Sequence, residues 1–260
     1  MIVHQFGNSK KNFHYNSYVY SCGTVWNAHF HDSYELIYVM EGENEISLNG
    51  NPVTLSEHEL LLISPNAVHS FEVRSGTRMW VGVFSSDHIS AFAKKYSSVQ
   101  FSKFSCERDT EKMLCEKLFL KEKPDRYLRI AYLYTVCDAC EKNAEYLNAH
   151  NEQKFMNSVI SYISNNIDDD ITMQGLAAQL GYEYHYLSSL FNQCFSMNFK
   201  RFLNTYKVEK ACTLLEDREK NVMSVYKECG FSSMRNFNRV FKDISGYTPS
   251  EYKKMKCETV

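Results

Sequence analysis

Residues Gly230 to Lys253 read GFSSMRNFNRVFKDISGYTPSEYK. The apolar side chains in this stretch recur at the spacing of one helix face, at Phe237, Val240, Phe241 and Ile244. This face is therefore predicted to lie against a core. The opposite face carries donors suited to base edges and phosphates, namely Arg235, Asn236, Asn238, Arg239 and Lys242. An amphipathic helix with such an outer face is typical of a DNA recognition helix.

Three residues around this helix predict where its neighbours begin and end. Gly230 precedes it and permits a sharp turn from a shorter helix. Thr248 is predicted to cap the next helix, with Pro249 at its first position. A short helix, a tight turn and a longer helix with a polar outer face together predict a helix-turn-helix.

A second copy of the pattern lies about fifty residues upstream. Its turn glycine is Gly181, which matches Gly230, and its apolar pair Leu190 and Phe191 matches Val240 and Phe241. Further matched positions in the two copies are Leu176 and Val225, Tyr182 and Phe231, Met197 and Tyr247, Phe202 and Tyr252. The offset is 49 residues before the recognition helix and 50 after it. Two copies in fixed register are far more specific than one.

These two stretches carry a family resemblance. Residues 172–253 resemble the DNA-binding domain of the AraC-type transcription regulators, through TMQGLAAQLGYEYHYLSSLF (residues 172–191) and the stretch quoted first. The resemblance implies that helices 183–195 and 232–244 enter successive major grooves. A connecting helix over residues 198–216, of nineteen residues and roughly 28 Å, is predicted to separate them.

The residues expected to contact DNA come from both helices. The first helix offers His185, Ser188, Ser189 and Asn192. The second offers Ser233, Arg235, Asn236, Asn238, Arg239 and Lys242. Because two arginines can contact base edges in pairs, the second helix is expected to discriminate sequence more strongly.

Composition and charge fit a two-domain regulator. The chain has 260 residues, 44% of them hydrophobic, which suits two cores. Its net charge is −2, but residues 183–256 carry 13 Lys and Arg against 8 Asp and Glu, a net of +5. We expect domains at 1–145 and 152–257, with a polar linker over 143–151. The start of the chain does not resemble a signal peptide, and no long apolar run is present, so a cytoplasmic protein is expected.

The cysteines predict neither a disulfide framework nor a metal site. Nine are scattered along the chain, and Cys137-x-x-Cys140 is the closest pair. This pair lies inside a helical pattern with no second pair nearby. Buried thiols in a reducing compartment are favoured over zinc or redox chemistry.

The first half of the chain is predicted to be rich in β-strands. Runs at residues 35–40, 45–49, 59–63 and 79–84 have the composition and period of strands, and Asn49-Gly50 is a hairpin signal. Short strands separated by turns favour a small barrel or jelly roll. The spacing G-x5-HxH-x3-E-x6-G from Gly23 to Gly42 resembles the first cupin motif, and Pro65 to His69 resembles part of the second.

The cupin-like pattern places polar side chains inside the predicted barrel. Its candidate ligand-binding residues are His29, His31, Glu35, His69, Tyr38 and Trp80. The histidines and the glutamate could form a metal site, or could line a pocket for an organic ligand without metal. No cofactor and no bound metal are predicted. For Tyr38 and Trp80, packing in a plain core is the alternative.

Helical periods follow the strands. Ile89, Phe92, Ala93 and Tyr96 form one apolar stripe, and further stripes are expected at 113–118 and at Leu128, Ala131, Tyr132, Thr135 and Val136. In proteins of similar layout such helices form a dimer interface. Packing of these helices against the barrel is an equally good interpretation.

The favoured fold class is therefore α+β, with a cupin-like β-barrel, a helical dimerisation segment and an all-α double helix-turn-helix. The resemblance implies a DNA-binding transcription regulator that is not an enzyme, acts as a homodimer on an operator with RNA polymerase as a partner, and responds to a small molecule. Sugars are common effectors of such proteins. The alternative is a metal-dependent cupin enzyme with an attached helical module.

Overall fold

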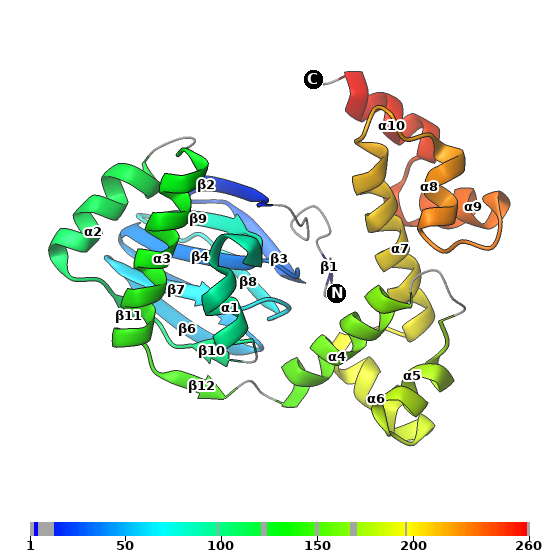
Figure 1. Ribbon diagram of the computed structural model, residues 1–260, viewed down its shortest axis with the longest axis horizontal. Coiled ribbons are helices and arrows are strands. Elements are labelled where there is room, and N and C mark those ends of the chain that lie inside the picture. Colours follow the sequence, from blue (N-terminus) through cyan, green and yellow to red (C-terminus); the bar gives the residue numbers. More distant parts are fainter. Residues whose placement is uncertain are drawn as a thin grey trace. The chain divides into compact units, whose positions relative to one another are not determined.

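The computed structural model describes residues 3–4, 13–97, 99–120, 124–148, 151–166, 171–195 and 197–258. Contacts divide the chain into two compact units, one ending at Lys154 and the other running on from Phe155 (Figure 1). The first unit is built mainly from strands and the second from helices. The predicted α+β fold class with two differently built halves is confirmed. Within the described residues, no helix combines the length and apolarity needed to cross a bilayer.

Among the described residues, the strand-rich unit contains two larger antiparallel sheets and the two-stranded sheet of β10 and β12. Its strands are β2 (Tyr15–Ser21), β3 (Val25–Phe30), β4 (Tyr34–Glu41), β5 (Glu43–Leu48), β6 (Asn51–Ser56), β7 (Glu59–Ile63), β8 (His69–Glu72), β9 (Arg78–Phe84), β10 (Val99–Phe101), β11 (Phe104–Ser105) and β12 (Tyr146–Asn148). The short strand β1 (Val3–His4) is assigned by its contacts to the other unit, together with residues from Phe155 onward. One sheet has the order β3-β8-β5-β6 and the other β11-β7-β4-β9-β2. The predicted hairpin at Asn49-Gly50 joins β5 to β6, with positive φ at both residues.

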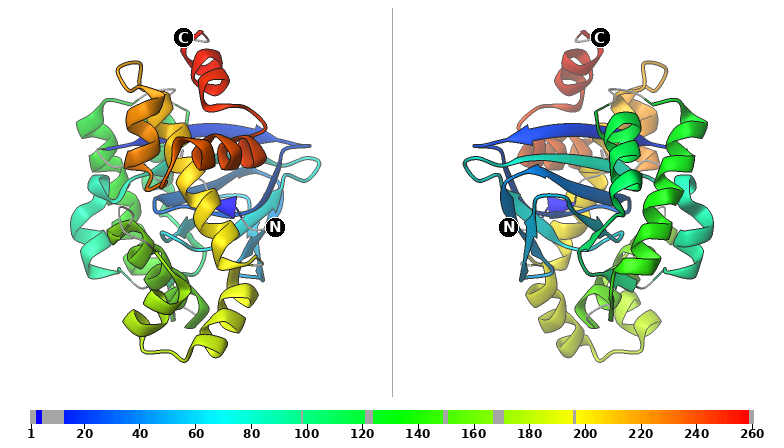
Figure 2. Two further views of the ribbon diagram at one scale, coloured as in Figure 1. Left: turned by 90° about the vertical axis from the view of Figure 1, so that its right-hand side faces the viewer. Right: turned by 90° about the vertical axis from the view of Figure 1, so that its left-hand side faces the viewer.

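Strand β4 separates the two cores of this unit. Its side chains alternate, so Ile37 and Val39 join the core between the two sheets, while Leu36 and Tyr38 join the core against the helices. Both faces of β4 are buried from residue 34 to residue 39. Helices α1, α2 and α3 all lie on the same side of the strands (Figures 1 and 2).

The helices of the strand-rich unit confirm one predicted apolar stripe and correct another. They are η2 (Ser86–Ile89), α1 (Ser90–Lys95), α2 (Arg108–Leu114), η3 (Cys115–Phe119) and α3 (Arg126–Asn143). Ile89, Phe92 and Tyr96 are buried as predicted. In α3 the predicted stripe is confirmed at Val136, and Tyr132 packs against the same core, but Leu128 and Ala131 are exposed. The buried positions of α3 are Leu133, Val136, Cys137, Ala139 and Cys140.

The expected linker over residues 143–151 is also largely wrong. Helix α3 runs to Asn143, and residues 146–148 then form β12, which pairs antiparallel with β10. The pairing joins residues almost fifty positions apart, so a local polar composition could not reveal it. The next helix, α4, begins at Asn151.

The helical unit contains two helix-turn-helix motifs joined by one long helix. Its elements are α4 (Asn151–Asn165), α5 (Met173–Leu180), α6 (Tyr184–Phe195), α7 (Phe199–Leu215), α8 (Val222–Glu228), α9 (Met234–Ser245) and α10 (Pro249–Glu258). The predicted helix 198–216 is two residues shorter, because Asn198 is the N-cap of α7 and Glu216 its C-cap. Figure 2 shows α5 and α6 towards one end of α7 and α8 and α9 towards the other. The run of three aspartates at 168–170, whose composition predicts a solvated turn rather than a metal site, lies outside the described residues.

The repeat inferred from sequence corresponds to matching elements. Helix α8 starts 49 residues after α5, and α9 starts 50 residues after α6. Gly181 and Gly230 both have positive φ, of 71° and 66°. Thr172, Ser233 and Thr248 accept hydrogen bonds at the starts of their helices, as N-caps do. Each motif has an aromatic core; in the second, Phe237 and Phe241 are fully buried.

In β9 the backbone of Gly82 lies close to the ring of Trp80, so a larger residue at position 82 tests the packing of the strand-rich unit. A methyl group on Gly82 would lie 2.2 Å from a ring carbon of Trp80. We expect Gly82→Ala to lower the free energy of unfolding by about 1–3 kcal/mol, since overpacking displaces the indole. Both tryptophans of the chain lie in this unit, so their fluorescence during urea unfolding monitors it selectively.

Thr54→Ala, at an exposed position of β6, is the matched control, with an expected change within about 0.5 kcal/mol. Equal stability of Gly82→Ala and the unmodified protein would contradict this packing.

Candidate functional site

Four buried polar side chains converge between the two sheets. His29 lies near the end of β3, His31 just after it, Glu35 on β4 and His69 at the start of β8. They are only 1–3% exposed. One ligand atom from each lies within 4.8 Å of the others. Thus the structure brings together the four residues that the cupin-like spacing singled out.

Hydrogen bonds orient all three imidazoles in the same way. The Nδ1 atoms lie 2.7, 3.1 and 2.9 Å from backbone oxygens, in the order His29 to Asn27, His31 to Ser33 and His69 to Ala67. On the other side, Glu35 Oε2 lies 3.1 Å from His31 Nε2 and 3.2 Å from His69 Nε2. Because each Nδ1 is held by the backbone, the Nε2 atoms face the cluster.

Burial and mutual charge shift the pKa values within the cluster. Burial alone raises the pKa of Glu35, but His69 and His31 outweigh it and hold the carboxyl ionised. Burial lowers the pKa of His69, but the Glu35 carboxylate outweighs this effect and raises it. For His29, burial followed by repulsion from His69 lowers the pKa to about 3, so this imidazole is neutral. Three nitrogen donors and one carboxylate are chemically suited to a divalent metal ion.

Two residues predicted to bind ligand lie elsewhere. Tyr38 and Trp80 point to the opposite side of their sheet and pack in the core with the helices. The Tyr38 hydroxyl donates to Glu111 at 2.6 Å, and its ring stacks on Phe119 with centroids 4.6 Å apart. Burial, then hydrogen bonding to Cys115 and Glu111, raises the pKa of Tyr38. Even-numbered positions of β4 face away from Glu35, so Tyr38 cannot share its pocket.

The buried thiols predicted at Cys137 and Cys140 are confirmed as buried. Burial raises the pKa of both thiols, that of Cys140 to about 12. Neither belongs to a group of potential metal ligands among the described residues.

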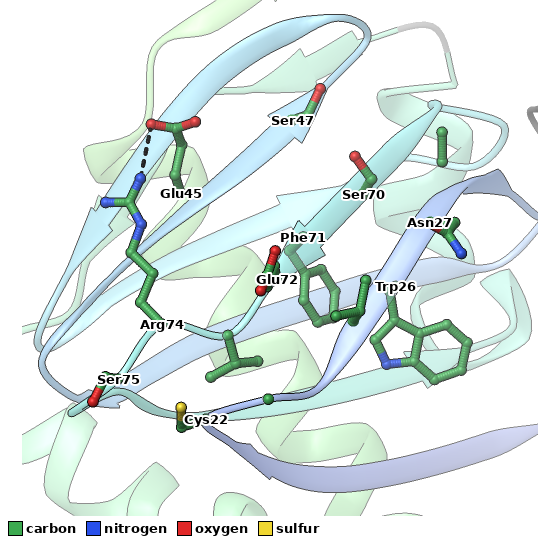
Figure 3. Close-up of a pocket in the computed structure, with 14 residues that line it drawn as sticks. Cys22, Trp26, Asn27, Glu45, Ser47, Ser70, Phe71, Glu72, Arg74 and Ser75 are labelled. Atoms are coloured by element: carbon green, nitrogen blue, oxygen red, sulfur yellow. Dashed lines mark hydrogen bonds and ion pairs between the residues drawn. The ribbon is translucent and has the colours of Figure 1, made fainter.

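An open groove of about 530 Å³ lies on the sheet that contains β3, β8, β5 and β6 (Figure 3). It is lined by parts of β3, β5, β8 and the turn that follows β8, including Asn27, Glu45, Ser70 and Arg74. Arg74 pairs across it with Glu45 at 3.2 Å. The groove is lined by none of the four clustered residues, and sequence periodicity did not identify it.

The outer face of α9 carries the cations predicted to meet DNA. Arg235, Asn238, Arg239 and Lys242 are exposed. Arg239 Nη2 donates to Asn236 Oδ1 at 3.0 Å, one turn earlier. Ser233 also begins this helix, since its hydroxyl accepts the Asn236 N–H at 3.2 Å. The same serine therefore serves as the N-cap of α9 and remains exposed, as its predicted contact with DNA requires.

Compared with the outer face of α9, the predicted contact residues on the outer face of α6 are uncharged. His185, Ser189 and Asn192 are exposed, and Ser188 is half-buried. Three exposed tyrosines, at positions 182, 184 and 186, surround the start of this helix. The Glu183 carboxylate accepts the Tyr186 N–H at 2.9 Å, and such backbone bonds lower the pKa of Glu183. Predicted contact residues of both helices thus lie at accessible positions, with unequal charge.

Two lysines of α7, missed by sequence analysis, position α9. Lys207 is 8% exposed, and its Nζ donates to the Gly230 carbonyl at 2.5 Å. Lys210 Nζ donates to the Glu228 carbonyl at 2.7 Å. Both cations lie at the carbonyl end of α8, where they satisfy free acceptors and favour the helix dipole. Lys207 precedes Val208 and lies one turn before Ala211, and both of these belong to the apolar stripe of α7. A lysine at the edge of an apolar stripe was the signal from which this role could have been predicted.

Comparison with known proteins matches each half of the chain to a family. Residues 18–101 match the family described as an AraC-like ligand binding domain, and residues 176–255 match a helix-turn-helix domain family. The uncharacterized HTH-type transcriptional regulator YtdP of Bacillus subtilis (strain 168) is 25% identical over 156 residues, covering 58% of this chain and 19% of YtdP. The uncharacterized HTH-type transcriptional regulator SAS0078 of Staphylococcus aureus (strain MSSA476) is 30% identical over 98 residues, covering 38% of this chain. This chain spans only 13% of the length of SAS0078.

A solved structure of similar fold is that of ToxT from Vibrio cholerae. Its TM-score is 0.54 at 15% identity, and the match covers 94% of this chain and 99% of ToxT. ToxT of strain SCE256, solved with a bound unsaturated fatty acid, has a TM-score of 0.54 at 14% identity over 94% of this chain and 96% of ToxT. With a ligand-binding half and a double helix-turn-helix half both matched, the chain belongs to the AraC-type transcription regulators.

Proposed function

We propose that this chain binds a specific DNA operator through α6 and α9. The observation that carries this proposal is the pair of amphipathic helices, one in each motif, whose outer faces are exposed and polar. Helix α7 joins the motifs and has 17 residues, which corresponds to roughly 25 Å. A spacer of this size suits two recognition helices about one DNA turn (~34 Å) apart.

The two helices are proposed to contribute unequally. Helix α9 offers the guanidinium groups of Arg235 and Arg239, and each bidentate contact to a guanine is worth about 1–3 kcal/mol of discrimination. Helix α6 offers shorter polar side chains and tyrosines, which suit hydroxyl contacts and apolar contact with thymine methyl groups. Asn236 holds Arg239 along the helix, which reduces the freedom that the guanidinium must lose on binding.

The strand-rich unit is proposed to bind the effector. Its match to a ligand-binding family supports this role. ToxT, whose fold is similar, has been solved with a bound unsaturated fatty acid. Effector binding would then change the population of DNA-binding states. A sugar remains the class suggested by the layout of the sequence.

Helix α3 is proposed to form the interface of a homodimer. Its outward face carries Tyr127 (81% exposed), Leu128, Ala131 and Tyr134. Leu128 and Ala131 of this face belong to the stripe for which a dimer interface was one of the two interpretations from sequence. An apolar face of this kind is suited to a second copy of itself. A dimeric regulator would act in the cytoplasm on RNA polymerase at the promoter.

Catalysis is not part of the proposal. The clustered histidines and glutamate are closed to an organic substrate by their burial. The chain is therefore proposed to be a regulator without enzymatic activity, in preference to a metal-dependent cupin enzyme.

We expect Arg239→Ala to weaken binding to the preferred duplex by more than ~10-fold, since it removes a paired contact to a base. Arg235→Ala is expected to act similarly, and Ser189→Ala to have a smaller effect. The measurement is fluorescence anisotropy with a duplex selected by the protein from a random library, compared with its scrambled version.

Lys94→Ala is the control for loss of one positive charge, because this exposed lysine lies on α1 of the other unit. Its affinity should match that of the unmodified protein. A greater loss for Ser189→Ala than for either arginine variant would show that α6 dominates recognition.

For assembly, Tyr127→Glu should convert the full-length dimer to monomers, because a charge would enter an apolar interface. Sedimentation velocity at micromolar concentration measures this directly. Thr54→Glu, at an exposed position of β6, should leave the dimer intact. A protein that is monomeric before any substitution would refute the role of α3.

A further inference from the structure

Helices α6 and α9 begin after equivalent residues of different charge. Glu183 precedes α6, and Ser233 precedes α9. In both motifs the backbone oxygen of this residue accepts the N–H four positions on, at 2.9 Å from Leu187 and at 3.0 Å from Phe237. In both motifs the side chain accepts the N–H three positions on, at 2.9 Å for Glu183 and 3.2 Å for Ser233. Glu183 is therefore an N-cap with a carboxylate where the second motif has a hydroxyl.

The Glu183 carboxylate is ionised and exposed. Hydrogen bonds from the backbone N–H groups of His185 and Tyr186 lower the pKa of Glu183. These bonds also hold the carboxylate at the start of α6. An ionised carboxylate offers about four acceptor positions, so capping leaves it able to accept from a further donor.

Charge also distinguishes the two helices themselves. The residues of α6 include no Lys, Arg, Asp or Glu, so Glu183 gives the start of this helix a net negative charge. Helix α9 carries Arg235, Arg239 and Lys242 against Asp243. Guanine edges and phosphates present acceptors, which attract the cations of α9 and repel a carboxylate. The starts of the two helices therefore suit different groups of a DNA duplex.

The major groove offers few groups that can donate to a carboxylate. A recognition helix places its N-terminal residues at the base edges of this groove. The donors there are the amino groups of cytosine and adenine. Adenine presents the N7 acceptor beside its amino group, so it is matched by an amide that both donates and accepts. A carboxylate, which can only accept, is matched by the amino group of cytosine.

We propose that Glu183 accepts a hydrogen bond from the amino group of a cytosine and is a specificity-determining residue of the first motif. This inference rests on the proposed binding of α6 to an operator. The capping bonds fix the carboxylate before DNA binds, so little side-chain freedom is lost on contact. The same negative charge opposes contact with phosphates, which dominate binding to unrelated sequences.

The experiment compares the duplexes that the full-length protein and Glu183→Ser select from a random library. Serine copies the cap of the second motif, so α6 should remain capped. We expect the duplex preferred by the unmodified protein to contain a cytosine that the variant does not require. Replacing this C·G pair by T·A should weaken binding by the unmodified protein at least ~5-fold, but by the variant less than ~2-fold, in fluorescence anisotropy.

A second variant separates base reading from loss of the cap. Glu183→Gln removes the charge but keeps an oxygen that can accept the Tyr186 N–H. It should also lose the requirement for cytosine. Circular dichroism of both variants should match that of the unmodified protein.

Two controls test whether the effect belongs to the start of α6. Arg239→Ala should relax a different position, roughly one helical turn (~10 bp) away, and should keep the requirement for cytosine. Glu72→Gln removes an exposed carboxylate from β8 of the other unit, and it should bind every duplex like the unmodified protein.

Three results would contradict the role of Glu183. If both Glu183 variants require the same base pairs as the unmodified protein, Glu183 does not read the operator. An equal gain in affinity for selected and scrambled duplexes, with no position relaxed, would show that the carboxylate only repels phosphates. Failure of the unmodified protein to select any duplex would refute the proposed operator binding itself, and the role of Glu183 with it.

Discussion

The strand-rich unit depends on a strand that is buried on both faces. Strand β4 directs Glu35, Ile37 and Val39 towards one core and Tyr34, Leu36 and Tyr38 towards the other. The inward face admits one carboxylate only because His31 and His69 lie against it and compensate its charge. The outward face holds the helices. The carboxylate of Glu35 and the side chains that pack against the helices therefore lie on the same strand. A change in the position of β4 would affect both.

The helical unit also combines a buried core with polar side chains, and it does so twice, once in each helix-turn-helix motif. Each motif buries one aromatic stripe and leaves a polar face exposed, so recognition surface and core are produced together by one helical period. Helix α7 contributes more than length, because Lys207 and Lys210 bind carbonyl groups at the end of α8 and in the turn that follows. The orientation of α9 is thus coupled to the helix that separates the two motifs.

Much of this architecture could be predicted because its signals are local. The strands with period-two alternation, the Asn49-Gly50 hairpin and the cap Thr248 lie where the sequence places them. The pattern H-x-H-x3-E was also informative. The four positions from His31 to Glu35 lead from the end of β3 into β4. As a result, Nε2 of His31 and Oε2 of Glu35 lie 3.1 Å apart. The separation of two repeated motifs by one helix follows from the offset of 49 and 50 residues.

The sequence by itself determined the two halves of the chain, their element types, the exposed polar faces of α6 and α9 and the four polar residues of the cluster. Tertiary structure alone decided which apolar positions are covered. Leu128 and Ala131 are exposed whereas Leu133, Val136 and Ala139 are buried, because the core covers only part of the face of α3 that the helical period suggests. It also separated Tyr38 and Trp80 from the histidines and joined β12 to β10. These outcomes depend on contacts between residues far apart in the chain, which periodicity within one segment cannot specify.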